Sequence, residues 1–189
     1  MTSGKLEPSA QGAPLARRVS IKRIGIALGV IFGVPAALIG AFLIFTLWAS
    51  NPLSVGDDGP RTVGRTPDGS PFDLAAVVKG RPALVNLWAT WCTWCLEEMP
   101  AIAAVADAHP ELAVVGLVVD LDIDELKDIR AKHPMPYPVG IISEASLVRW
   151  HVLTWPTTYL IDARGEVVHT IVGAATREGF EAAIREHLR

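Results

Sequence analysis

The sequence contains very little cysteine, only Cys92 and Cys95 among 189 residues. Two thiols cannot build the several bridges that hold small disulfide-rich exported domains together. The net charge is only -3, with 17 basic against 20 acidic residues, so the composition indicates no nucleic-acid partner. With 50% hydrophobic residues, the chain is too apolar for a disordered protein, and its length suits one ordinary domain with additional segments.

One long segment, residues 24–49, lacks charged residues altogether. As a helix that rises about 1.5 Å per residue, it can cross a hydrocarbon core about 30 Å thick. A cleaved signal peptide is the competing interpretation, but its apolar region covers only roughly 7–15 residues and ends in small side chains. Because the bulky Leu47 and Trp48 occupy that end, we predict a single uncleaved transmembrane helix.

The orientation of this anchor follows from the residues before it. Residues 1–23 carry five basic side chains against the single acidic residue Glu7. Basic residues beside a membrane span tend to stay in the cytoplasm. We therefore expect a cytoplasmic tail, a single-pass anchor in the inner (cytoplasmic) membrane, a turn-rich linker at residues 50–60, and a periplasmic or otherwise extracytoplasmic domain at residues 61–189. Disulfides form and persist on that side.

Within residues 61–189, apolar runs of strand length alternate with segments of helical periodicity. Asp68-Gly69 is typical of a hairpin turn. This order predicts an α/β layer fold with a parallel core that ends in an antiparallel hairpin. We expect strands at residues 83–88, 112–119, 157–161 and 167–172, and helices at residues 93–108, 123–132, 144–150 and 177–188.

The spacing of the two cysteines suits a structural staple, half of a metal clamp or a redox pair. A staple that closes so small a loop contributes only roughly 2 kcal/mol in the chain-entropy estimate. A zinc site needs two further ligands close together, whereas His109 and His133 lie far apart in the chain. An acidic run that begins at Asp120 resembles a calcium loop but has Glu125 where that loop needs glycine. We therefore predict no metal site and no cofactor.

The redox interpretation explains the position of the pair, where an apolar strand ends and a helix is predicted to begin. Unpaired backbone N–H groups and the helix dipole at such a place favour a thiolate. A cysteine one turn further along can attack a mixed disulfide formed at the first. We therefore predict that Cys92 is the nucleophile, exposed at the helix start, and that Cys95 is the resolving thiol.

The motif NLWATWCTWCLEEMP at residues 86–100, followed by WPTTYLID at residues 155–162, resembles the membrane-anchored thioredoxin-like family of TlpA, ResA and CcmG (DsbE). The resemblance covers residues 61–189. It implies a thioredoxin-like fold, with a mixed central sheet flanked by helices, and thiol–disulfide exchange on exported client proteins through a redox-active disulfide. It also implies a membrane electron donor of the DsbD or CcdA type, and often a part in cytochrome c or cytochrome oxidase maturation.

The strand before the motif carries Asn86 where thioredoxins typically have a buried aspartate that accepts a proton. Asn86 cannot titrate, so Glu98 is the candidate carboxylate, at the position where the family carries its acidic residue. On a helical wheel, Glu98 lies only about 60° from Cys95, whereas Glu97 lies about 200° away, toward solvent. We predict a catalytic role for Glu98, with a solvated helix face as the competing interpretation.

Trp91, Trp155 and Pro156 are the candidate substrate-binding residues. In the family, the proline that matches Pro156 is cis and faces the cysteines, and the residue before it offers its backbone to the substrate chain. For this Trp-Pro pair, the competing interpretation is a plain strand start. For Trp91, it is a packing role. Trp94 stands where relatives commonly have proline, and the bulky Trp155 precedes Pro156. Both residues bear on redox potential and client specificity.

The direction of electron flow is predicted from the charge around the pair. Thr93 and Trp94, between the cysteines, bring no positive charge to a Cys92 thiolate, which favours a reductant over a strong oxidant. Two alternatives stay open. One is a disulfide oxidase or isomerase, and the other is a non-enzymatic Cu(I)-binding chaperone that uses the same thiols. The chaperone would need a third soft ligand, for which the sequence offers Met99.

Overall fold

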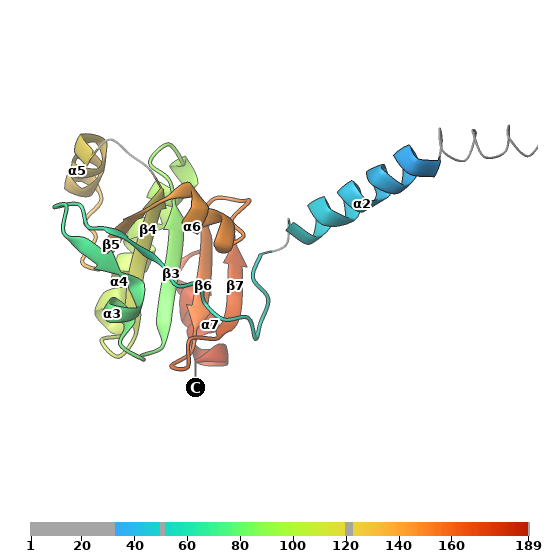
Figure 1. Ribbon diagram of the computed structural model, residues 1–189. Coiled ribbons are helices and arrows are strands. Elements are labelled where there is room, and N and C mark those ends of the chain that lie inside the picture. The colour runs from blue at the N-terminus through green and yellow to red at the C-terminus, as the bar shows by residue number, and fades with distance from the viewer. Residues whose placement is uncertain (1–32, 50–51, 120–122, 189) are drawn as a thin grey trace, which may run out of the picture. The chain divides into compact units, whose positions relative to one another are not determined.

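The computed structural model describes residues 33–49, 52–119 and 123–188, which fall into two units divided at residues 46 and 47 (Figure 1). Helix α2 spans Val34–Ala49 and exposes large apolar side chains such as Leu38 and Phe42. Residues 24–32 of the predicted anchor lie outside the described residues. Among the described ranges, no helix combines the length and the apolar character that crossing a membrane requires.

The second unit is built on a seven-stranded sheet in the order β2-β1-β5-β4-β3-β6-β7. Strands β3, β4 and β5 are parallel, while β6 and β7 form an antiparallel hairpin beside β3, as predicted. The sheet is therefore mixed, and the predicted thioredoxin-like α/β class is confirmed. The strands are β1 (Val63–Arg65), β2 (Pro71–Asp73), β3 (Ala83–Trp88), β4 (Ala113–Val119), β5 (Val139–Ile142), β6 (Thr157–Ile161) and β7 (Val167–Val172).

The helices predicted from apolar periodicity are confirmed to within one residue at each end. They are α4 (Thr93–Ala108), α5 (Ile123–Lys132), α6 (Glu144–Arg149) and α7 (Arg177–His187). Two short elements were not predicted, β5 and α3 (Leu74–Val78). Strand β5 has only four residues, which include a glycine and follow a proline-rich segment. Helix α3 is about one turn long, and the Asp73 carboxylate caps it by accepting a hydrogen bond from the Ala75 N–H.

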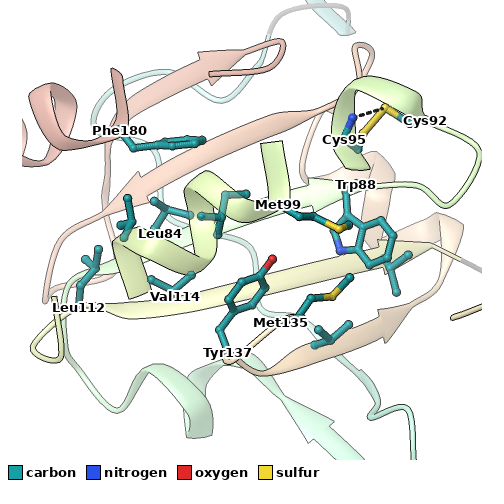
Figure 2. Close-up of a cluster of buried hydrophobic side chains, with 14 of the residues drawn as sticks. Leu84, Trp88, Cys92, Cys95, Met99, Leu112, Val114, Met135, Tyr137 and Phe180 are labelled. Atoms are coloured by element: carbon teal, nitrogen blue, oxygen red, sulfur yellow. Dashed lines mark hydrogen bonds between the residues drawn. A yellow bond between two sulfur atoms is a disulfide. The ribbon is translucent and has the colours of Figure 1, made fainter. Parts of the chain in front are cut away.

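Strand β3 alternates between two hydrophobic clusters, one on each face of the sheet. Leu84 and Trp88 belong to the cluster with the buried side chains of α4 and α7 (Figure 2). Val85 and Leu87 belong to the cluster on the opposite face, which also contains Trp150 and side chains of α3. All six residues of β3 are buried, so packing on both faces holds this central strand in position. The strand therefore determines the position of the cysteine motif that follows it.

Part of the segment predicted as a linker is bound to the domain. Leu53 is buried, and the N–H of Gly56 donates to the carbonyl of Val167 at 2.8 Å. The N–H of Val167 donates in turn to the carbonyl of Asp57 at 2.8 Å. These bonds satisfy backbone groups at one end of β7, the last strand of the sheet.

Candidate active site

Cys92 and Cys95 form a disulfide at the N-terminal end of α4, with their Cα atoms 5.3 Å apart (Figure 2). Cys92 is the N-cap residue of this helix, and its sulfur accepts a hydrogen bond from the Cys95 backbone N–H at 3.2 Å. After reduction, that donor and the helix dipole would stabilise negative charge on the Cys92 sulfur. The nucleophilic role of Cys92 stays a prediction, and this geometry supports it.

The expectation that Cys92 lies exposed is wrong for this oxidised state. Cys92 is only 5% exposed and Cys95 1%. The chain turns back directly before the helix, where the Cys92 N–H donates to the Ala89 carbonyl at 3.1 Å, and Cys92 joins the buried cluster that contains Trp88. The two cysteines are therefore similarly buried, and what distinguishes Cys92 is the hydrogen bond that its sulfur accepts from the Cys95 N–H.

Glu98 lies on the inner face of α4 and is 3% exposed, while Glu97 is exposed, as the helical wheel predicts. One carboxylate oxygen of Glu98, Oε1, accepts from Asn86 Nδ2 at 2.7 Å. The other, Oε2, accepts from the backbone N–H of Ala175 at 3.1 Å. Burial raises the pKa of Glu98 to about 7, and the two hydrogen bonds limit the rise. A carboxyl that changes charge near neutral pH thus lies one helical turn beyond Cys95.

Large aromatic side chains surround the N-terminal end of α4. Trp91 is 70% exposed and Trp94 66%, whereas Trp88 is buried. Trp91 meets the half-buried Trp155 edge to face, with ring centroids 6.0 Å apart and an interplanar angle of 76°. This exposure is against the packing interpretation of Trp91 and leaves its ring free to meet another molecule.

A groove of about 470 Å³ opens beside this aromatic pair, and we call it the tryptophan groove. Trp91 and Trp155 line it together with Glu144, Leu147 and Val148 of α6. Sequence reasoning missed the α6 residues, because they lie in no motif and far along the chain from the cysteines. The one available signal was Val148, an apolar residue on the side of the predicted helix that proves to be exposed.

The peptide bond between Trp155 and Pro156 is cis, as predicted. Pro156 is buried at the start of β6, and Trp155 packs against both hydrophobic clusters. The structure therefore brings Trp91 and Trp155 together beside the disulfide. Their predicted role in binding substrate remains a proposal.

In the part of the chain that the structure describes, no group of three or more His, Cys, Asp or Glu side chains is placed to hold a metal ion. Residues 120–122 of the acidic run lie outside the described residues. Met99 is buried on the inner face of α4, in the same cluster as the cysteines.

Comparison with known proteins gives a consistent result. Residues 54–185 match the family model described as Redoxin. A thiol-disulfide oxidoreductase ResA of Bacillus cereus is 28% identical over 137 residues, which cover 71% of this chain and 79% of that protein. The sporulation thiol-disulfide oxidoreductase A of Bacillus subtilis (strain 168) is 29% identical over 112 residues, 56% of this chain and 68% of that protein. A solved thiol:disulfide interchange protein of the thioredoxin family from Chlorobium tepidum TLS has 28% identity and a TM-score of 0.63, covering 72% of this chain and 99% of that one.

Replacing Glu98 should change the pH dependence of the chemistry. In Glu98→Gln, the profile of thiol exchange against pH should lose an inflection near pH 7, where the wild-type carboxyl titrates. Glu97→Gln is the matched control, because Glu97 is the neighbouring carboxylate in solvent, and its profile should follow the wild type. Insulin reduction across a pH series measures both, and identical profiles for the two variants would refute the role of Glu98.

The same variant allows an independent check by stability. The pKa of Glu98 is raised from 4.5 to about 7 in the folded protein. Its contribution to the free energy of unfolding is therefore fully present below pH 4.5 and is lost as the pH rises through about 7. Wild-type stability to denaturant should therefore carry a falling component over that window. Glu98→Gln should lack this component, and Glu97→Gln should keep it.

Proposed function

This chain belongs to the redoxin family and is a thiol-disulfide oxidoreductase, and we propose that it reduces disulfides of exported client proteins outside the cytoplasm. The observation that supports the reductive direction is that the hydrogen-bond donor to the Cys92 sulfur is a backbone N–H and not a charged side chain. This sulfur accepts from the Cys95 N–H, and the residues between the cysteines, Thr93 and Trp94, are neutral.

The reaction proceeds through two exchanges of sulfur. The Cys92 thiolate attacks one sulfur of the client disulfide, and the other client sulfur leaves as a thiolate that takes a proton. Cys95 then loses its proton and attacks the Cys92 sulfur, which releases the second client thiolate. The client gains two electrons, and Cys92 and Cys95 end as the disulfide that the structure contains. A membrane thiol donor of the DsbD or CcdA type would return the pair to its reduced form.

Glu98 has a place in the second exchange. Its carboxyl lies on the same helix as Cys95, one turn further in, and titrates near neutral pH. An ionised Glu98 can take the proton that Cys95 must lose, and a neutral Glu98 can return a proton when the pair is reduced again. Since a pKa near the working pH suits both steps, burial of this carboxyl supports its use in proton transfer.

Magnitudes support the proposed reducing direction. DsbA, a strong oxidant, combines a thiolate pKa of about 3.5 with about -120 mV, whereas thioredoxin combines about 7 with about -270 mV. That gap corresponds to roughly 7 kcal/mol, and a charge at a helix end gains only about 0.3–2 kcal/mol. An ionised Glu98 would oppose a thiolate further. Cys92 therefore lacks most of the stabilisation that an oxidant needs.

We expect a reduction potential below about -200 mV and a pKa of about 7 or higher for Cys92. Equilibration of the protein in graded glutathione buffers measures the potential, and thiolate absorbance in the ultraviolet measures the pKa. A potential above about -160 mV together with a pKa below about 5 would favour an oxidase instead.

The tryptophan groove supports the use of a protein substrate. Its walls are the aromatic pair Trp91 and Trp155 and the apolar side chains of α6, and it begins at the residue before Cys92. Such a surface can hold the apolar residues that flank a client cysteine. We propose that client segments bind here, with Trp155 and Pro156 beside the exchanging sulfur.

Trapping should identify these clients and the order of the two thiols. In cells, Cys95→Ser should accumulate mixed disulfides, because the client stays bound to Cys92 when no resolving thiol is present. Cys92→Ser is the matched control and should accumulate none. Adducts through Cys95 alone would reverse the assigned roles. Cytochrome c or cytochrome oxidase maturation factors among the trapped proteins would support the proposed pathway.

The proposed location rests on the uncharged segment at residues 24–49 and on its basic N-terminal flank. The exposed apolar side chains of α2 support the same assignment. We expect a reporter that is active only in the periplasm to be active when fused to the C-terminus, in the membrane fraction. An inactive reporter, or a soluble product without its first fifty or so residues, would contradict the anchor.

A further inference from the structure

A polar row crosses the sheet directly beneath α4. Asn86 is the one polar residue in the buried strand β3, and it lies on the face that Leu84 and Trp88 share with α4. Across the strand pairs, Asn86 lies opposite Thr158 on β6 and opposite Gly116 on β4. A Cβ added at Gly116 would lie 3.1 Å from Trp88 Nε1, so glycine leaves the room that the Trp88 ring occupies.

The amide of Asn86 donates within this row to Thr158 of β6 and across to Glu98 of α4. Nδ2 donates to Glu98 Oε1 at 2.7 Å and to Thr158 Oγ1 at 2.9 Å. All three side chains are buried, at 2% exposure for Asn86, 3% for Glu98 and 1% for Thr158. Because an ionised carboxylate only accepts hydrogen bonds, the nitrogen of the amide must face Glu98 in that state, and the Thr158 oxygen holds the amide in this orientation.

We propose that Asn86 and Thr158 are positioning residues for proton transfer, which keep the Glu98 carboxyl hydrogen-bonded in both its charged and its neutral form. In the charged form, Nδ2 of Asn86 donates to Glu98. In the neutral form, a half-turn of the amide presents Oδ1, which accepts from the Glu98 O–H and from the Thr158 hydroxyl. The hydroxyl of Thr158 serves in both states, since it can accept or donate.

This pairing explains why an amide suits β3 better than a second acid. An aspartate at residue 86 would bring two carboxyl groups within hydrogen-bond distance, and these would share one proton rather than titrate independently. An apolar residue would leave the charged form of Glu98 with the Ala175 N–H as its remaining donor among the contacts described. The amide supports either charge state and adds no charge of its own.

Other ionisable groups near Glu98 lie on or next to α4 and on neighbouring elements. Cys92 and Cys95 precede it on α4 and ionise only when reduced. Tyr137, before β5, lies in the same cluster, and burial raises its pKa, with a further rise caused by the charge of Glu98. Arg130 of α5 acts on Tyr137 in the opposite sense. Since the Tyr137 phenol stays neutral near pH 7, it does not replace Glu98 as the titrating group.

The inference rests on the exchange function proposed above, and the titration of Glu98 in the oxidised protein tests it separately. Full-length protein labelled with ¹³C at the glutamate carboxyl is titrated by NMR, and Glu98→Gln assigns the signal. Asn86→Leu should raise the midpoint by about 0.7–1 pH unit, because the hydrogen bond that it removes is stronger to the charged carboxyl than to the neutral one. Thr158→Val should raise it by roughly 0.4–1 unit, because the charged form then has an Asn86 N–H without its acceptor, whereas in the neutral form the Asn86 oxygen still accepts from Glu98.

Thr158→Ser is the conservative control, because it keeps the hydroxyl, and its midpoint should stay at the wild-type value. The pH inflection of thiol exchange should move in parallel with the midpoint in each variant. If Asn86→Leu does not fold, Thr158→Val decides, since valine matches threonine in shape. An unmoved midpoint in Thr158→Val, with normal exchange activity, would overturn this inference and leave the proposed function intact. If the wild-type protein showed no thiol exchange at all, the proposed function would be overturned instead.

Discussion

The hydrogen bond from the Cys95 N–H to the Cys92 sulfur joins the chemistry of this protein to its fold. It exists because the buried strand β3 ends directly before α4, so that the first cysteine caps the helix. Successive apolar side chains of the strand point into two hydrophobic clusters on opposite faces of the sheet. A shift of the strand by one residue would turn every side chain to the wrong face. The packing of β3 therefore determines where the reactive sulfur lies.

The same alternation brings a carboxyl into the core. Glu98 faces the sheet from α4 and meets Asn86 from β3, while the loop before α7 supplies the Ala175 N–H. Desolvation favours the neutral carboxyl and outweighs these donors, which favour the charged one, so the pKa is raised to about 7. A buried acid that is hydrogen-bonded on both oxygens can change charge without disturbing the packing around it.

Periodicity was enough to predict most of the elements, because the buried strands are continuous apolar runs and the helices carry apolar stripes. It failed at β5 and α3, where four or five residues are too few to show a period. At the site, the helical wheel placed Glu98 inward and Glu97 outward correctly. It could not show that Cys92 is buried, because the turn back to the Ala89 carbonyl depends on packing against Trp88.

By itself, the sequence determined the redox pair, the class of fold and the inward direction of Glu98, since each depends on residues that are close together in the chain. Only the tertiary structure decided which groups meet across it. Thr158 faces Asn86 because two antiparallel strands pair in one register, and Val148 joins Trp91 in the tryptophan groove because α6 packs beside the active-site turn. The pKa of Glu98 is likewise a tertiary property, because burial and two distant hydrogen-bond donors set it.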